Sequence, residues 1–248
     1  MRRKINPILQ LLAIIYHITI FLPLGIIVTI ILCTITIIVL PFAGNTHWSN
    51  LPAIIWARTL CALSLVRVSV QGSENIDPKA SYIFVANHQS LYDMPLVYGW
   101  LKNNFKWIIK KEFRKMPIMG KTCELMGHIF IDRSNPMRAK NSLDIAKQNL
   151  KQGNNSIFLF PEGTRTRNGQ IGRFKRGAFT IARDLHLPIV PITINGAFNA
   201  LPKGLNYIIP GTIEMIIHSP IDTTKLNDDN LNEMIYKIKT TIQSDLKP

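Results

Sequence analysis

The longest pattern in the chain is an apolar run close to its start. No Asp, Glu, Lys or Arg occurs within residues 5–57, and residues 8–42 are almost wholly apolar. A membrane-spanning helix needs about 20 such residues, and the apolar core of a signal peptide has about 7–15, so this run is too long for one untilted span or a signal peptide. The Pro-Leu-Gly sequence at 23–25 is expected to interrupt it. We therefore predict two helices, 6–22 and 25–42, that form a membrane-associated hairpin.

Basic residues flank the apolar run on both sides. Three of them occupy residues 2–4, and Arg58 and Arg67 follow the run with no acidic residue between them. Because cytoplasmic flanks of membrane segments carry the excess of Lys and Arg, both ends of the hairpin are predicted to be cytoplasmic. A hairpin that spans the bilayer and one that enters a single leaflet both satisfy this pattern. A buried core helix of a soluble protein is the alternative to both.

Beyond the apolar run, short apolar segments alternate with helical patterns. Segments typical of strands lie at residues 66–70, 82–86, 156–160, 189–194 and 212–218. Patterns typical of helices lie at 94–101, 136–150, 175–185 and 231–242. This alternation predicts an α/β domain. We predict an anchoring segment at residues 1–45 and a second domain at 46–248, and Pro191 favours an edge or strand-end position for its strand.

Composition narrows the class of partner. The 248 residues carry 29 Lys and Arg against 15 Asp and Glu, for a formal net charge of +14. Such a surplus suits nucleic acid, anionic lipid, a phosphorylated substrate or an acidic carrier protein. The isolated cysteines Cys33, Cys61 and Cys123 show no Cys-x-x-Cys or metal-ligand spacing, so we predict reduced thiols and no metal site.

The strongest candidate chemistry follows the strand predicted at residues 82–86. His88 comes directly after it, and Asp93 follows five residues later, just before Pro95. Five residues turn a helix through about 500°, so the two side chains can meet only if His88 lies in a turn and Asp93 begins the next element. A carboxylate on one ring nitrogen fixes the tautomer and makes the other nitrogen a better base. Because a lone His–Asp pair is more often structural, its companions in the chain decide its meaning.

Three further blocks accompany this pair. They are Gly-His-Ile-Phe-Ile-Asp-Arg at residues 127–133, Phe-Pro-Glu-Gly-Thr-Arg at 160–165 and Val-Pro-Ile at 190–192. Two basic stretches lie among them: residues 102–121 hold seven basic residues and one acid, and residues 163–183 hold six basic residues and no acid. Lipid headgroups, nucleic acid and plain solvation all remain open for the first stretch. In the second, Arg173, Lys175 and Arg176 either contact an acyl carrier or are merely solvated.

In this order the four blocks resemble the glycerolipid acyltransferase family, and within it the 1-acylglycerol-3-phosphate acyltransferases, over roughly residues 60–220. The resemblance implies a mixed sheet flanked by helices, with an N-terminal helical membrane motif. It also implies phospholipid synthesis at a membrane, on the cytoplasmic face of a bacterial inner membrane. An acyl group would pass from acyl carrier protein or coenzyme A, the co-substrate, to the 2-hydroxyl of 1-acylglycerol-3-phosphate, giving phosphatidic acid without a further cofactor.

The resemblance also implies a role for each matching residue. His88 would remove the hydroxyl proton, Asp93 would orient the imidazole, and Lys110, or its neighbour Lys111, would polarise the thioester carbonyl. Arg133 and Arg165 are the candidate phosphate clamps, and Glu162 would position Arg165 or a substrate hydroxyl. The predicted substrate-binding set is Arg133, Glu162, Gly163, Thr164 and Arg165.

Three rival functions remain. A sibling acyltransferase would use glycerol-3-phosphate or another lysolipid as acceptor. A metal-dependent hydrolase would use His88 and Asp93 as ligands, although no His-x-x-Glu-His pattern supports it. A non-catalytic, basic, membrane-associated binding module would account for the charge and the apolar run, but it leaves the block at residues 160–165 without a purpose.

Overall fold

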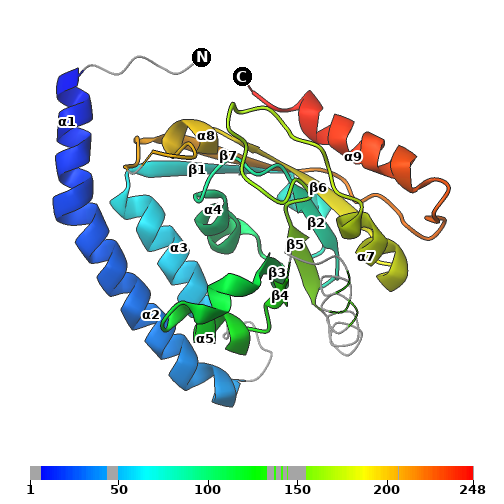
Figure 1. The fold of residues 1–248 in the computed structure, drawn as a ribbon, viewed down its shortest axis with the longest axis horizontal. Coiled ribbons are helices and arrows are strands. Elements are labelled where there is room, and N and C mark those ends of the chain that lie inside the picture. Colours follow the sequence, from blue (N-terminus) through cyan, green and yellow to red (C-terminus); the bar gives the residue numbers. More distant parts are fainter. Residues whose placement is uncertain are drawn as a thin grey trace.

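The structure, a computed structural model, describes residues 7–43, 50–132, 137, 141, 144, 155–205 and 207–247. Its centre is a seven-stranded sheet with the strand order β1-β7-β6-β2-β5-β3-β4 (Figure 1). The strands are β1 (Val66–Gln71), β2 (Ile83–Ala86), β3 (Phe105–Lys110), β4 (Ile129–Ile131), β5 (Ser156–Leu159), β6 (Ile189–Asn195) and β7 (Gly211–Ile217). All neighbouring strands are parallel except β6 and β7, so the predicted mixed α/β sheet is confirmed.

Helices cover both faces of the sheet. Helices α3 (Leu51–Leu63) and α4 (Asp93–Trp100) lie on one face, and α7 (Gly177–Leu185) and α9 (Leu231–Ser244) lie on the other (Figure 1). Strand β2 shows why both faces must be covered: Phe84 belongs to the core under α4, whereas Ile83 and Val85 belong to the core under α7 and α9, and all three are fully buried. A parallel strand buried on both faces is continuously apolar, as this one is.

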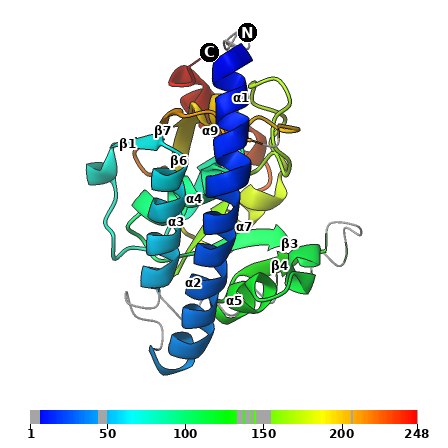
Figure 2. The ribbon, with the colours of Figure 1, turned by 90° about the vertical axis from the view of Figure 1, so that its left-hand side faces the viewer.

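The N-terminal apolar run forms one continuous helix, so the predicted hairpin of helices 6–22 and 25–42 is wrong. Helix α1 (Pro7–Tyr16), the π-helical turn η1 (His17–Phe21) and α2 (Leu22–Ala43) follow one another end to end (Figure 2). Pro23 lies in the first turn of α2, directly after a turn in which the Leu22 N–H donates to the His17 carbonyl oxygen. A π-helical turn is one way in which a helix accommodates a proline, because it relieves the clash with the preceding turn.

This long helix packs against α3 rather than against its own second half. Gly25, expected to break the run, instead packs against α3, where a Cβ built on it would make an ordinary contact with Leu60 Cδ2 at 3.5 Å. The indole N–H of Trp56 donates to Thr29 Oγ1 at 3.0 Å across the same contact. The helix over Pro7–Phe42 is long and apolar enough to cross a membrane, and only 11% of its most apolar window is buried. That exposure disfavours the alternative of a buried core helix.

The structure assigns the basic stretch 102–121 to regular elements and corrects the prediction made for Pro191. The basic stretch 102–121 contains strand β3, the 3-10 helix η4 (Lys111–Lys115) and α5 (Met119–Leu125), because apolar residues alternate with its cations. Strand β6 is internal instead of an edge strand, although it contains Pro191. The proline is tolerated because the described ladder with β7 starts at Ile192, so no N–H is needed at Pro191 on that side. The helix predicted at 136–150 lies largely outside the described residues.

Candidate active site

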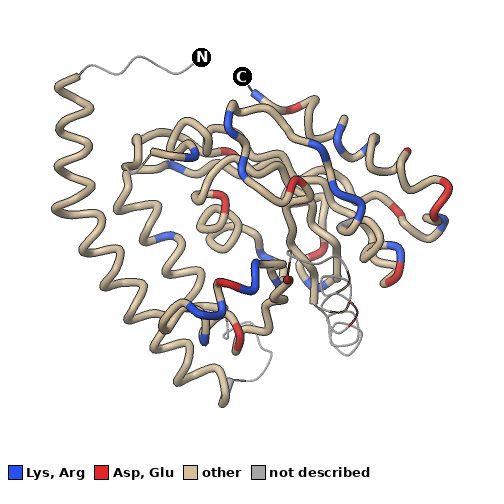
Figure 3. Tube along the Cα trace, in the orientation of Figure 1, with Lys and Arg blue, Asp and Glu red and all other residues tan. Residues whose placement is uncertain are grey.

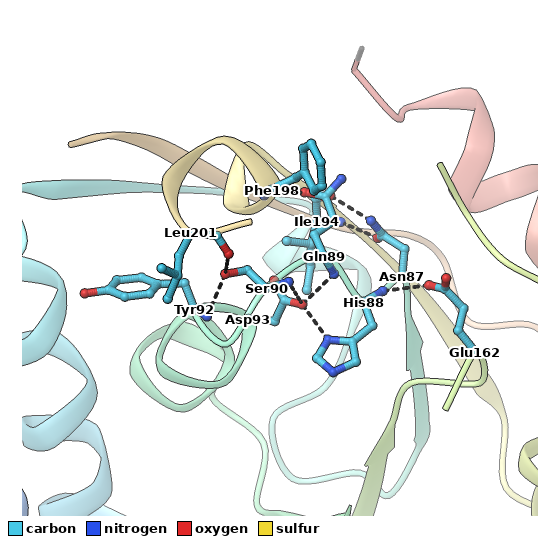
Figure 4. A network of polar contacts seen from close by, with 10 residues as sticks. All are labelled: Asn87, His88, Gln89, Ser90, Tyr92, Asp93, Glu162, Ile194, Phe198 and Leu201. Carbon is cyan, nitrogen blue, oxygen red and sulfur yellow. Dashed lines mark hydrogen bonds and ion pairs between the residues drawn. The ribbon is translucent and has the colours of Figure 1, made fainter. Parts of the chain in front are cut away.

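The end of strand β2 is fixed by a buried asparagine. Asn87 Nδ2 donates to the Ile194 carbonyl oxygen at 2.9 Å, and the Ile194 N–H donates to Asn87 Oδ1 at 2.7 Å (Figure 4). This reciprocal pair ties the strand end to β6. The chain therefore leaves the sheet at a defined point, and His88 begins the following turn.

His88 and Asp93 meet as the sequence predicts. His88 Nδ1 lies 2.7 Å from Asp93 Oδ2, and Asp93 is the fully buried first residue of α4 (Figure 4). The same carboxylate oxygen accepts the N–H groups of Gln89 and Ser90 at 2.7 and 2.9 Å. Asp93 therefore accepts a hydrogen bond from the Nδ1–H of His88, which leaves Nε2 as the ring nitrogen that can accept a proton.

Glu162 forms a hydrogen bond with the backbone of His88. Its Oε1 accepts the backbone N–H of His88 at 2.8 Å, and its Oε2 accepts the N–H of Gly172, also at 2.8 Å. Each oxygen therefore accepts a backbone N–H, and the bond at Oε1 positions the turn that carries His88. The expected contact of Glu162 with Arg165 or a substrate hydroxyl stays a prediction. Burial raises the pKa of this carboxyl, and the two backbone N–H groups oppose that rise.

Phe160 packs flat against the His88 ring. The two ring centroids are 3.9 Å apart and the planes are inclined by only 8°. The Thr166 N–H also donates to the His88 carbonyl oxygen at 2.9 Å. Sequence reasoning gave Phe160 no role. Its position at the end of β5, which pairs in parallel with β2, is the signal that could have placed it beside His88.

These groups line a pocket of about 340 Å³ that combines apolar walls with cations. The lining is formed by His88, Leu91, Met94, Trp107, Ile108, Ile109, Lys110, Phe113, Leu159, Phe160, Gly163, Thr164, Arg165 and Lys203. Lys110 ends β3 and faces the pocket, whereas Lys111 forms an ion pair with Asp132 at 2.6 Å. The geometry therefore favours Lys110 as the lysine that reaches a bound thioester.

The predicted binding turn is present at the same pocket. Gly163 has φ +71°, a backbone conformation that favours glycine, and a Cβ built there would lie 2.8 Å from the flexible end of the Lys175 side chain. Thr164 and Arg165 line the pocket with it. Arg133 lies outside the described residues. Lys203 was missed, because a Pro-Lys-Gly sequence far from every block carries no signal by itself.

The structure gives little support to the metal-ligand alternative. Within the described residues, no group of three or more His, Cys, Asp or Glu side chains is placed to hold a metal ion. The 2.7 Å contact between His88 and Asp93 is a hydrogen bond and leaves no space for an ion between them. The three cysteines carry free thiols; Cys61 is buried, whereas Cys33 and Cys123 are half-buried.

Comparison with known proteins agrees with this geometry. The Acyltransferase family model matches residues 67–195, more than half of the chain. The chloroplastic 1-acyl-sn-glycerol-3-phosphate acyltransferase LPAT1 of Arabidopsis thaliana is 34% identical over 80% of this chain and 54% of its own length. The 1-acyl-sn-glycerol-3-phosphate acyltransferase of Cocos nucifera is 32% identical over 85% of this chain and 68% of its own. The chain thus spans about half to two thirds of the length of these curated relatives.

A solved structure shares the fold along nearly the whole chain. The crystal structure of the 1-acyl-sn-glycerophosphate acyltransferase PlsC from Thermotoga maritima superposes with a TM-score of 0.78 and 26% sequence identity, covering 96% of each chain. The matched family region contains the His88–Asp93 pair and the block at residues 160–165. The chain therefore belongs to the acyltransferase family.

Proposed function

We propose that this protein transfers an acyl group from an acyl thioester to the sn-2 hydroxyl of 1-acyl-sn-glycerol-3-phosphate, forming phosphatidic acid. The observation that carries the proposal is the pocket itself: an imidazole oriented by a buried carboxylate faces a space that has apolar walls and three cations. An acceptor with an acyl chain, a hydroxyl and a phosphate matches these three features. The similar proteins named above carry the same activity in their names.

The reaction follows from the placement of His88. Its Nε2 takes the proton of the acceptor hydroxyl while the oxygen attacks the thioester carbonyl carbon, and Asp93 stabilises the imidazolium. Lys110 stabilises the negative charge on the carbonyl oxygen of the tetrahedral intermediate. The carbon–sulfur bond then breaks, and the thiolate takes the proton back from His88. General-base assistance of this kind contributes about 10²–10⁴ in rate.

The proposed donor is the thioester of acyl carrier protein or coenzyme A, with no further cofactor. Both donors carry phosphate, and the cations Arg173, Lys175 and Arg176 form part of a basic loop that also contains Arg165. We place the reaction at a membrane, because the exposed helix Pro7–Phe42 suits a bilayer. We assign it to the cytoplasmic face of a bacterial inner membrane, because basic residues flank the apolar run on both sides in the sequence. The anchoring segment at residues 1–45 and the catalytic domain at 46–248 are the division that we propose.

The test is acyl transfer by purified protein in detergent. Wild type, His88→Ala and the control His186→Asn are offered labelled acyl carrier protein and coenzyme A thioesters with 1-acylglycerol-3-phosphate. His186 is an exposed residue in the left-handed region, a conformation that asparagine tolerates, so the control should remain active. We expect phosphatidic acid from wild type and the control, and a loss of at least about 100-fold in His88→Ala.

The same assay separates the rival functions. Product from glycerol-3-phosphate or another lysolipid, but none from 1-acylglycerol-3-phosphate, would identify a sibling acyltransferase. Near-normal transfer by His88→Ala would refute the general-base mechanism. Failure of every donor and acceptor would leave the basic binding module as the function to pursue.

A further inference from the structure

The pocket beside His88 has an unbalanced positive charge. Among the described residues, its lining includes Lys110, Arg165 and Lys203 and contains no Asp or Glu. Two buried carboxylates lie behind the lining: Asp93 bonds to the His88 ring, and Glu162 directs both of its oxygens to backbone N–H groups. Uncompensated cations that converge on one pocket favour an anionic ligand there.

Lys203 reaches this pocket because the catalytic turn holds the segment that carries it. Gln89 Oε1 accepts the N–H of Phe198 at 3.2 Å, and Ser90 Oγ donates to the Leu201 carbonyl oxygen at 2.8 Å (Figure 4). These bonds attach α8 (Ala197–Ala200) and the residue after it to the turn between His88 and Asp93. The side chains of this turn therefore position a cation that lies more than 100 residues further along the chain.

The ammonium group of Lys203 lies at the binding turn. Its Nζ donates to Thr164 Oγ1 at 3.3 Å, next to Arg165 in the chain. A lysine ammonium has three N–H donors, so the hydrogen bond to Thr164 leaves two of them for a ligand. Among the described residues, no carboxylate forms an ion pair with Lys203, in contrast to Lys111, which is paired with Asp132.

We propose that Lys203, together with Arg165, binds the phosphate of the acyl acceptor; this inference rests on the function proposed above. A phosphate monoester carries about −1.5 to −2 charges near pH 7, which two cations balance. Arginine's planar fork contacts two phosphate oxygens, and the lysine supplies a point charge for a third. Lys110 is then left for the thioester carbonyl oxygen.

Chemistry favours the acceptor phosphate over a donor phosphate. In 1-acylglycerol-3-phosphate the phosphate and the reacting hydroxyl are on neighbouring carbons, so a phosphate near Thr164 can accompany a hydroxyl at His88. In either donor the long pantetheine arm separates the phosphate from the thioester. Lys203 and His88 line the same pocket, so the short separation fits better.

The test compares Lys203→Met with Lys203→Arg and with Lys237→Met, an exposed lysine of α9 on the other side of the sheet. A hydrogen bond to a charged group is typically worth about a 10- to 100-fold change in binding. We expect KM for 1-acylglycerol-3-phosphate to rise by about that factor in Lys203→Met. KM for the acyl thioester should stay within about twofold, Lys203→Arg should recover most of the affinity, and Lys237→Met should match wild type. An unchanged acceptor KM, or a rise in the donor KM alone, would overturn the inference.

A second measurement keeps this inference separate from the proposed function. The melting temperature of each variant is recorded with and without glycerol-3-phosphate, which needs no turnover. Stabilisation of wild type and Lys203→Arg, but not of Lys203→Met, supports the phosphate site even if 1-acylglycerol-3-phosphate proves not to be a substrate. Equal stabilisation of all variants contradicts it even if phosphatidic acid is formed. Similar melting temperatures without ligand show that Lys203→Met is folded.

Discussion

At the scale of single residues, His88 is held on four sides. Asp93 binds its ring nitrogen, Phe160 covers its ring, Glu162 accepts its backbone N–H, and Thr166 donates to its carbonyl oxygen. Three of these four contacts come from the loop after β5. A block remote in sequence thus fixes the geometry of His88, the proposed general base, and general-base catalysis depends on such fixed geometry.

Glu162→Gln should disturb this arrangement without changing the size of the side chain. An amide offers one oxygen, so its NH₂ group would face either the His88 or the Gly172 N–H, and a buried donor would lose its acceptor. We expect the rate of acyl transfer to fall about 10- to 100-fold. Steady-state kcat measures the effect, and Glu233→Gln, at an exposed position of α9, is the matched control. Wild-type kcat in Glu162→Gln would show that these bonds do not position His88.

The raised pKa of Glu162 makes a separate prediction about pH. Between the ordinary value of 4.5 and the raised pKa, the folded protein retains a proton that the unfolded chain has lost. The stability of wild type relative to Glu162→Gln should therefore fall as pH rises through that window. Melting temperatures of the two proteins from pH 4 upward measure this difference. A constant difference across the series would mean that burial does not shift this carboxyl.

At the scale of elements, α3 connects the long N-terminal helix to α4, a helix that covers the sheet. It contacts α2 through Gly25 and Trp56, and its Arg58 Nε donates to the Gly99 carbonyl oxygen of α4 at 3.0 Å. The apolar helix is therefore linked through two helix contacts to α4, which begins at Asp93.

Substitutions of Gly25 test the α2–α3 contact. A Cβ there would lie 3.5 Å from Leu60, an ordinary contact distance, so Gly25→Ala should be tolerated and the better helix propensity of alanine should assist it. Gly25→Leu adds atoms for which the contact has no room, and such overpacking typically costs about 1–3 kcal/mol. We expect a lower melting temperature for Gly25→Leu only. Equal melting temperatures would show that the two helices do not pack closely at this point.

At the scale of the whole molecule, charge and exposed apolar surface are segregated. The helix over α1 and α2 carries no Lys, Arg, Asp or Glu, whereas cations follow the loop of residues 163–176 and the segment from β3 to α5 (Figure 3). An apolar helix beside basic surfaces suits a membrane with anionic headgroups.

Replacing Leu9, Leu12 and Ile15 by Lys tests this association. Each side chain is 49–60% exposed in α1, so the fold should tolerate charge there. Burying each of these three apolar side chains in a bilayer would contribute about 1.5–3 kcal/mol to membrane binding. Their replacement by Lys should therefore lower binding to vesicles with anionic lipid by at least about 100-fold. Flotation with liposomes measures it. Leu65→Lys, at another exposed apolar position, is the control, and equal flotation of all proteins would contradict a role of α1 in membrane binding.

Local sequence determined much of this protein. The buried strands β2, β5 and β6 are short apolar runs, and the His88–Asp93 spacing requires a turn followed by a new element, which is what the structure shows. Both signals arise within a few residues, where period and spacing are read directly. The family also follows from short blocks, because their residue types and order are specific.

Tertiary structure alone decided the remaining features. The sequence of the apolar run did not reveal that Pro23 and Gly25 lie within one helix. That helix depends on the π-helical turn before Pro23 and on the packing of Gly25 against α3, which only the folded structure shows. Pairing of β2 with β5 brought Phe160 and Glu162 to His88, and side chains of the catalytic turn brought Lys203 to the pocket. Spacing along the chain encodes local geometry, whereas contacts between distant segments depend on which strands become neighbours in the folded sheet.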